Sequence, residues 1–132
     1  MCVDVGALLC VRLRDPASGI ERLFPPGGAI EPHEQPAQAA ARETLEETGY
    51  RVHVDEASER VANYPFVWAG REVQVSTSFF AARLASPRAA PAPVVPEAIV
   101  RGVVWLPLGE LDAALGFDAN ILAQVRALLP LR

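Results

Sequence analysis

Short blocks of hydrophobic residues, typical of β-strands, occur along most of the chain. Residues 3–13 are rich in Val, Leu and Cys, and the turn-forming run DPASG separates them from a short return strand at residues 20–24. Further β-like stretches are predicted at residues 50–54, 61–68, 72–84 and 99–105. Ala69-Gly70 forms a turn between the second and third of these, which predicts a hairpin there.

Helical spacing appears in two places. Residues 36–48 are predicted to be a helix, with Pro36 in the first turn and Gly49 as the C-cap glycine. Residues 108–115 form a helical turn or short helix, and residues 118–129 a final helix with Asp118 as N-cap. The expected buried face of the first helix consists of Ala37, Ala41, Thr44 and Thr48, flanked by Ala40 and Leu45. Strands around one strong helix, with another helix at the end, predict an α/β or α+β domain with a mixed sheet.

Composition narrows the class of protein. The 132 residues are 51% hydrophobic and 21% charged, which fits one globular domain over residues 1–132 and excludes a disordered chain. A net charge of −4 argues against a nucleic-acid polymer as partner, and no apolar run reaches the ~18–20 residues of a membrane span. Cys2 and Cys10 fit small apolar strand positions in a reducing compartment, so a cytoplasmic location is expected. The Pro- and Ala-rich residues 86–96 are expected to form a surface loop.

An acidic cluster on the first helix conflicts with local stability rules. Glu43, Glu46 and Glu47 lie three or four residues apart, where like charges repel, and near the C-terminal half, where the helix dipole disfavours anions. Such a conflict often marks a functional site. A divalent cation such as Mg²⁺ would relieve it through carboxylate oxygens. A solvated acidic face is the alternative explanation.

The residues around this cluster complete a recognisable spacing. Gly27-Gly28 permits close approach of the backbone to a ligand, and Glu34 and Arg42 are placed to form an ion pair between the loop and the helix. From Gly28 to Tyr50 the segment resembles the Nudix box, G-x5-E-x7-R-E-U-x-E-E-x-G-U, where U is a bulky aliphatic residue. All seven fixed positions match. Thr44 and Tyr50 occupy U positions, and the Thr44 hydroxyl is expected to bond back to the helix.

The resemblance extends over most of the chain, including WLPLGEL at residues 105–111. It implies an α/β/α sandwich around a mixed sheet and Mg²⁺- or Mn²⁺-dependent hydrolysis of a nucleoside diphosphate linked to another group. By the same resemblance the metal ligands are Glu43, Glu46 and Glu47, with a carbonyl of Gly27 or Gly28. Arg42 is expected to orient the glutamates and Glu34 to support the loop.

The resemblance leaves the general base and the substrate open. The base is either a box glutamate or a loop residue, for which Glu97 is the candidate. Stacking of a base predicts an aromatic pocket, although these residues also suit a core. The candidates are Phe24, Tyr64, Phe66, Trp68 and Phe80. Asn120 resembles an asparagine that contacts guanine in some family members, and a helix-cap role is the alternative.

The expected activity is that of a (deoxy)nucleoside triphosphate pyrophosphohydrolase, favoured by the minimal length of the chain. Hydrolysis of ADP-ribose or a nucleoside-diphosphate sugar is one alternative, and a non-catalytic nucleotide sensor is another. The expected partner is a nucleotide, with no membrane and no nucleic-acid polymer, and the protein is expected to be a monomer or homodimer.

Overall fold

The central sheet is antiparallel and is built around one long strand. The computed structural model describes residues 1–94 and 96–129. Strand β2 (Ala7–Arg14) pairs along one edge with β8 (Val100–Pro107) and along the other with β1 (Val3–Asp4) and β3 (Glu21–Phe24). Residues 8–11 of β2 are completely buried, which shows that both faces of the sheet are covered. Their run of Leu, Cys and Val side chains is what a strand buried on both faces requires.

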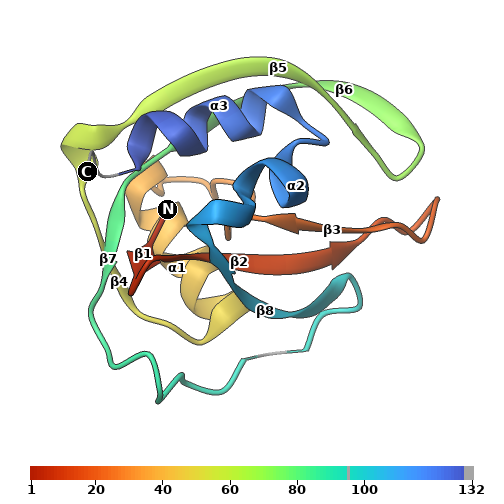
Figure 1. The fold of residues 1–132 in the computed structure, drawn as a ribbon. Helices are drawn as coiled ribbons and strands as arrows, with labels where there is room; N and C mark the ends of the chain where they lie inside the picture. Colours follow the sequence, from red (N-terminus) through yellow and green to blue (C-terminus); the bar gives the residue numbers. More distant parts are fainter. Residues whose placement is uncertain (95, 130–132) are drawn as a thin grey trace.

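Two smaller two-stranded sheets complete the β structure. Strands β5 (Arg60–Trp68) and β6 (Arg71–Phe79) form a long hairpin that arches beside helix α3 in Figure 1. Strand β4 (Val52–Val54) pairs with β7 (Ala82–Leu84). The short 3-10 helix η1 (Glu56–Ser58) leads from β4 toward β5. The expected hairpin around Ala69-Gly70 is confirmed, and both turn residues have positive φ.

Two of the expected strands are interrupted. The predicted strand at residues 3–13 contains a turn at Val5-Gly6, where φ is 47° and 71°, so β1 folds back on β2. The predicted strand at residues 72–84 divides into β6 and β7. The backbone of Ala81 leaves the ladder there, because its N–H donates to Ser58 Oγ (2.8 Å) and its carbonyl accepts from Asp55 N–H (2.9 Å).

The helices lie where the periodicity places them. Helix α1 (Pro36–Thr48) has the predicted bounds, and Gly49 caps it with φ 78° while donating to Leu45 O. The 3-10 turn η2 (Leu108–Glu110) leads into the short helix α2 (Leu111–Leu115), and α3 spans Ala119–Leu128. Asp118 is confirmed as the N-cap of α3, since its carboxylate accepts from the amides of Asn120 and Ile121.

The buried face of α1 differs in part from the expectation. Ala37, Thr44 and Thr48 are buried as expected, but Ala41 is only half-buried and Ala39 is buried in its place. Glu47, which the pattern assigned to the acidic outer side, is also buried, with 7% of its surface exposed. The Thr44 hydroxyl donates to Ala40 O (2.7 Å), as predicted. The hydrogen-bonding capacity of this buried side chain is therefore used within its own helix.

The layers give the expected α/β/α sandwich. Helix α1 packs on β4 and β8, while α2 contacts β3 and α3 contacts β5. The sheet is more antiparallel than expected: every strand pairing in the described chain is antiparallel, and parallel pairing is confined to the single bridge between Cys2 and Ala82. Within the described part of the chain, no helix has both the length and the apolar composition to cross a membrane.

Candidate active site

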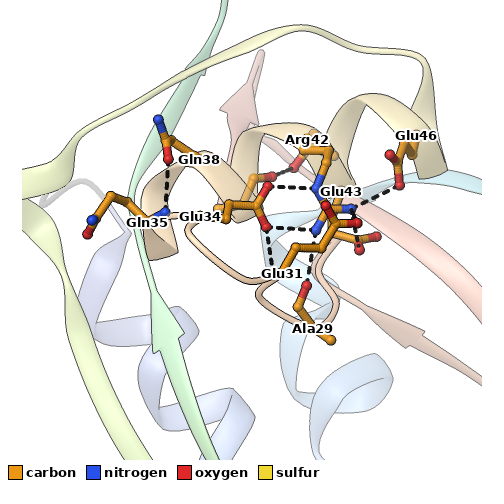
Figure 2. Close-up of polar contacts among 10 residues, drawn as sticks. Ala29, Glu31, Glu34, Gln35, Gln38, Arg42, Glu43 and Glu46 are labelled. Carbon is orange, nitrogen blue, oxygen red and sulfur yellow. Dashed lines mark hydrogen bonds and ion pairs between the residues drawn. The ribbon is translucent and has the colours of Figure 1, made fainter.

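An arginine on α1 fastens the loop that precedes the helix. Arg42 Nε and Nη2 donate to the two carboxylate oxygens of Glu34 at 2.7 and 3.0 Å, and Nη2 also donates to Ala29 O at 3.0 Å (Figure 2). The predicted ion pair between Glu34 and Arg42 is therefore present in a two-pronged geometry. Its hydrogen bonds hold the pKa of Glu34 down to about 2. The loop is thus fixed to α1 by a carboxylate that stays ionised.

The same guanidinium reaches two glutamates of the acidic cluster. Arg42 Nη1 lies 2.9 Å from Glu43 Oε1 and 3.2 Å from Glu46 Oε2, and Figure 2 shows all three side chains converging on one side of α1. Glu31, by contrast, is mostly exposed and stays 3.8 Å from Arg42. Arg42 therefore offsets part of the repulsion between Glu43 and Glu46.

Glu47 lies apart from this arginine, on the buried side of the helix. Its Oε1 accepts a hydrogen bond of 2.9 Å from the amide of Gly27. Burial raises the pKa of Glu47 to about 7, against the opposing effect of that hydrogen bond, and the negative charges of neighbouring glutamates raise it further. These neighbours are Glu43, Glu97 and Glu46. Of these, Glu97 lies outside the helix, in the loop before β8, and is exposed.

One of the two loop glycines, Gly28, packs closely on the helix, whereas a Cβ at Gly27 would meet no atom within 4 Å. A Cβ at Gly28 would lie 2.5 Å from the carboxylate carbon of Glu43, so only glycine fits without displacing that side chain. Gly27 donates its amide to Glu47, and the resemblance to the Nudix box implies a different role for this pair, with a carbonyl of Gly27 or Gly28 as a metal ligand. The loop thus shapes the cluster directly, through one hydrogen bond and one close approach.

The donor set suits a hard divalent cation. The carboxylates of Glu43, Glu46 and Glu47 and the carbonyls of the adjoining loop are all oxygen donors, the type of ligand that such a cation prefers. Over residues 1–94 and 96–129, however, no three acidic, histidine or cysteine side chains converge as a ready ligand set. Arg42 holds Glu43 and Glu46, and the Gly27 amide holds Glu47. The three glutamates have the right chemistry for a metal ion, but to hold one together their side chains would have to leave these contacts.

A cavity of about 520 Å³ adjoins the glycine loop. It lies between the loop, α1 and the β5–β6 hairpin, and its wall includes residues 25–30. The cavity brings together all five aromatic residues proposed for a base pocket: Phe24, Tyr64, Phe66, Trp68 and Phe80. Most of them also belong to the hydrophobic core or pack on it. The same side chains therefore form both the core and the wall of the cavity. The wall also includes Ser76, Thr77 and Ser78 of β6, three hydroxyl-bearing residues that a predicted strand at residues 72–84 does not mark as part of a site.

A second hollow, an open groove of about 680 Å³, lies on the other side of Phe24. Asn120 lines this groove and not the cavity, and it is exposed at the start of α3, where Asp118 rather than Asn120 is the cap. The structure therefore separates Tyr64 and Asn120, with Phe24 shared by both hollows. Phe117, which the sequence did not single out, packs edge-on against Phe24 at 5.3 Å and lies beneath the guanidinium of Arg22 at 5.0 Å.

The acidic helix, the glycine loop tied to it by Arg42 and the adjoining aromatic cavity thus lie next to one another in the fold. The family model of the NUDIX domain matches residues 2–127. The chain therefore belongs to the Nudix family and carries a nucleotide pyrophosphohydrolase domain.

Solved structures agree on the fold. A Nudix hydrolase from Nitrosomonas europaea has a TM-score of 0.71 and 20% identity, covering 95% of this chain and 81% of the other. An Ap4A hydrolase from C. elegans, in a binary complex, has a TM-score of 0.63 and 22% identity, covering 90% and 81%. The ORF135 protein of E. coli has a TM-score of 0.58 and 22% identity, covering 96% and 84%. A search of the curated proteins gave no significant match.

Proposed function

We propose that this protein hydrolyses a phosphoanhydride bond in a nucleoside diphosphate linked to another group, with Mg²⁺ or Mn²⁺ as cofactor. The observation that carries the proposal is the buried Glu47 carboxylate on the same helix as Glu43 and Glu46, held by the amide of Gly27, in a loop that also lines the cavity of about 520 Å³. An anionic phosphate chain is repelled by such a cluster unless cations lie between them. The bound cation supplies charge neutralisation of the phosphates.

Each residue of the site has a definite role in this proposal. Glu43, Glu46 and Glu47 hold the cation, with a carbonyl of Gly27 or Gly28 as a further donor. Arg42 orients Glu43 and Glu46 through its ion pairs, and Glu34 fixes Arg42 in turn. A carboxylate accepts the proton of the attacking water: either one of the helix cluster or that of Glu97, our candidate in the loop before β8.

The cavity supports a nucleoside triphosphate or deoxynucleoside triphosphate as the substrate. Its volume lies at the lower end of the roughly 300–1,000 Å³ typical of ligand pockets, which suits one base with its sugar. Its aromatic wall provides surfaces for stacking a base, and the hydroxyl groups of β6 provide hydrogen bonds. Phe24 and Tyr64 are then substrate-binding residues.

A substrate with a second bulky group is the alternative, and the groove favours it. Phe24, Phe66 and Trp68 line both hollows, so the groove with Asn120 adjoins the cavity and offers room for a second group. ADP-ribose, a nucleoside-diphosphate sugar or a dinucleoside polyphosphate has such a group. The structural similarity to an Ap4A hydrolase and to an ADP compounds hydrolase agrees with this alternative.

Product release from a nucleotide panel tests the proposal. The panel contains dNTPs, oxidised dGTP, ADP-ribose, nucleoside-diphosphate sugars and dinucleoside polyphosphates, each assayed with Mg²⁺ and with EDTA. We expect Mg²⁺-dependent turnover that collapses in Glu47→Gln and persists in Glu56→Gln, a control glutamate that is exposed on η1. Turnover unaffected by Glu47→Gln would refute the metal site. Tight binding without turnover of any nucleotide would indicate a sensor instead.

A further inference from the structure

Strand β6 has one edge that no other strand covers. In the described part of the chain β6 pairs with β5 alone, through the hairpin that turns at residues 69–70. Next to a two-residue turn the flanking pair, here Trp68 and Arg71, exchanges backbone hydrogen bonds, and the pairs beyond it alternate. Pro65 agrees with this alternation, because it has no N–H and lies opposite Gln74 in a pair that exchanges no hydrogen bond. The even-numbered residues of β6 therefore direct their backbone N–H and C=O groups away from β5.

This edge is occupied just beyond the strand and open within it. The Met1 amine donates to Phe80 O, and Ala82 N–H donates to Met1 O at 2.9 Å. At Ser76 and Ser78, by contrast, the backbone N–H and C=O groups have no partner among the described residues. The C=O of one residue and the N–H two positions later are neighbours on the edge of a strand. We call the C=O of Ser76 and the N–H of Ser78 the donor–acceptor pair of β6.

The cavity of about 520 Å³ meets β6 at this edge. Residues 75–79, five in succession, line it. Side chains alternate between the two faces of a strand, so a cavity that touched one face alone would be lined by every second residue. The unbroken run therefore shows that the cavity also touches the edge. Ser76 is exposed and Ser78 is half-buried, so a ligand in the cavity has access to the donor–acceptor pair.

The side chain between the two serines is already engaged. The Thr77 hydroxyl lies 3.3 Å from the Tyr64 hydroxyl, and the two form a hydrogen bond. Tyr64 is only 5% exposed, so this contact joins β6 to the buried side of β5. It holds the backbone on both sides of Thr77 in place, which presents the donor–acceptor pair at a fixed position in the cavity wall.

We propose that the donor–acceptor pair of β6 recognises the base of the substrate. The C=O of Ser76 accepts a hydrogen bond from an amino group or ring N–H, and the N–H of Ser78 donates to the neighbouring acceptor on the same edge of the base. The inference rests on the proposed function and names the part of the cavity that selects the base. Aromatic side chains of the wall contact the face of the ring, while the edge of β6 contacts its rim. The ligand class is a heteroaromatic ring with a donor and an acceptor on neighbouring atoms.

An amide NMR titration in Mg²⁺ tests this assignment without turnover, because a nucleoside monophosphate contains no phosphoanhydride bond. The probes are AMP, GMP, CMP and UMP, with ribose 5-phosphate as a probe that has no base. Ser78→Pro removes the proposed donor but no hydrogen bond to β5. Gln74→Pro is the matched control, since it removes an N–H from the same edge outside the cavity wall. Ser78→Ala removes the hydroxyl and keeps the N–H.

We expect the Ser78 amide proton to move downfield when the tightest of the four nucleotides binds, and to move further than that of Gln74. Ser78→Pro should raise the Kd of that nucleotide about five- to tenfold, the effect of losing one hydrogen bond. Gln74→Pro and Ser78→Ala should stay within about twofold of the native chain. Ribose 5-phosphate should bind all four proteins with the same Kd.

Several results would overturn the inference. These are an unmoved Ser78 amide, equal weakening by the two proline variants, and failure of all four nucleotides to bind. A dimer in sedimentation that protects the Ser78 amide from exchange would show that a strand of a second copy covers the edge instead. Urea unfolding checks that each variant is folded, and the amide shift in the native chain decides the question if Ser78→Pro is not.

Failure of this inference is distinguishable from failure of the proposed function. If Glu47→Gln abolishes turnover in the nucleotide panel while Ser78→Pro leaves the Kd unchanged, the recognition role is wrong and the proposed function stands. If Glu47→Gln retains full kcat, the proposed function itself is wrong.

Discussion

Replacing Glu47 by glutamine should stabilise the metal-free protein above neutral pH. Burial and neighbouring negative charges raise the pKa of Glu47 from 4.5 to about 7 in the folded chain. Between these two values the folded protein binds a proton that the unfolded chain releases, so the free energy of unfolding falls as pH rises through this window. The unfavourable contribution of the ionised carboxylate reaches about 3 kcal/mol at pH 8.

Glutamine avoids this cost, because it is neutral at every pH and its amide oxygen still accepts from the Gly27 amide. We expect Glu47→Gln to be more stable than the native chain by about 2–3 kcal/mol at pH 8 in EDTA, and by about 1 kcal/mol at pH 5. Urea unfolding at the two pH values measures both differences. Glu56→Gln, at an exposed position, should match the native chain at each pH.

In the presence of a divalent metal, the native chain should become more stable than Glu47→Gln. Mg²⁺ that binds the folded native chain stabilises it by mass action, whereas the glutamine variant has lost a ligand and gains less. A variant that is no more stable than the native chain at pH 8 in EDTA would refute the electrostatic reasoning. Equal stabilisation of both proteins by Mg²⁺ would refute the role of Glu47 as a ligand.

Three further predictions concern the loop, the arginine and the last helix. Gly28→Ala should lower kcat/KM at least about tenfold in the nucleotide assay, because its Cβ displaces the Glu43 carboxylate, while urea unfolding changes little. Arg42→Lys, which cannot reproduce the two-pronged bond to Glu34, should lower both the urea midpoint and the activity, whereas Glu31→Gln should leave both unchanged. Asp118→Ala should cost about 1 kcal/mol in urea unfolding through loss of the α3 cap, and an unchanged midpoint would contradict that capping role.

Features that depend on neighbouring positions in the chain could be predicted from the sequence. The bounds of α1, its glycine cap and the bond between Arg42 and Glu34 follow from helical spacing over a short segment. The burial of Glu47 could not be predicted in this way, because it depends on the loop amide that the fold places against the helix. The acidic pattern therefore predicted the site but not the side of the helix on which one of its glutamates lies.

Features that depend on distant partners were missed. The interruption between β6 and β7 requires the Ser58 hydroxyl, 23 positions earlier in the chain, to capture an amide that would otherwise continue the strand. Tyr50, Arg88 and Trp105 likewise meet from three segments that no local periodicity connects. The division of the proposed substrate residues between a cavity and a groove follows from the hairpin geometry, and residue spacing contains no information about it.

The two cysteines lie in different core clusters, so their reactivity reports local opening of each cluster separately. Cys10 is fully buried in the larger core cluster and Cys2 is nearly so in the smaller cluster on the α1 side of the sheet. Burial raises the pKa of both thiols, that of Cys10 to about 12, so neither reacts as a thiolate while it remains enclosed. The rates of alkylation at Cys2 and Cys10 under native conditions should consequently measure the opening of the two layers separately, without any introduced label.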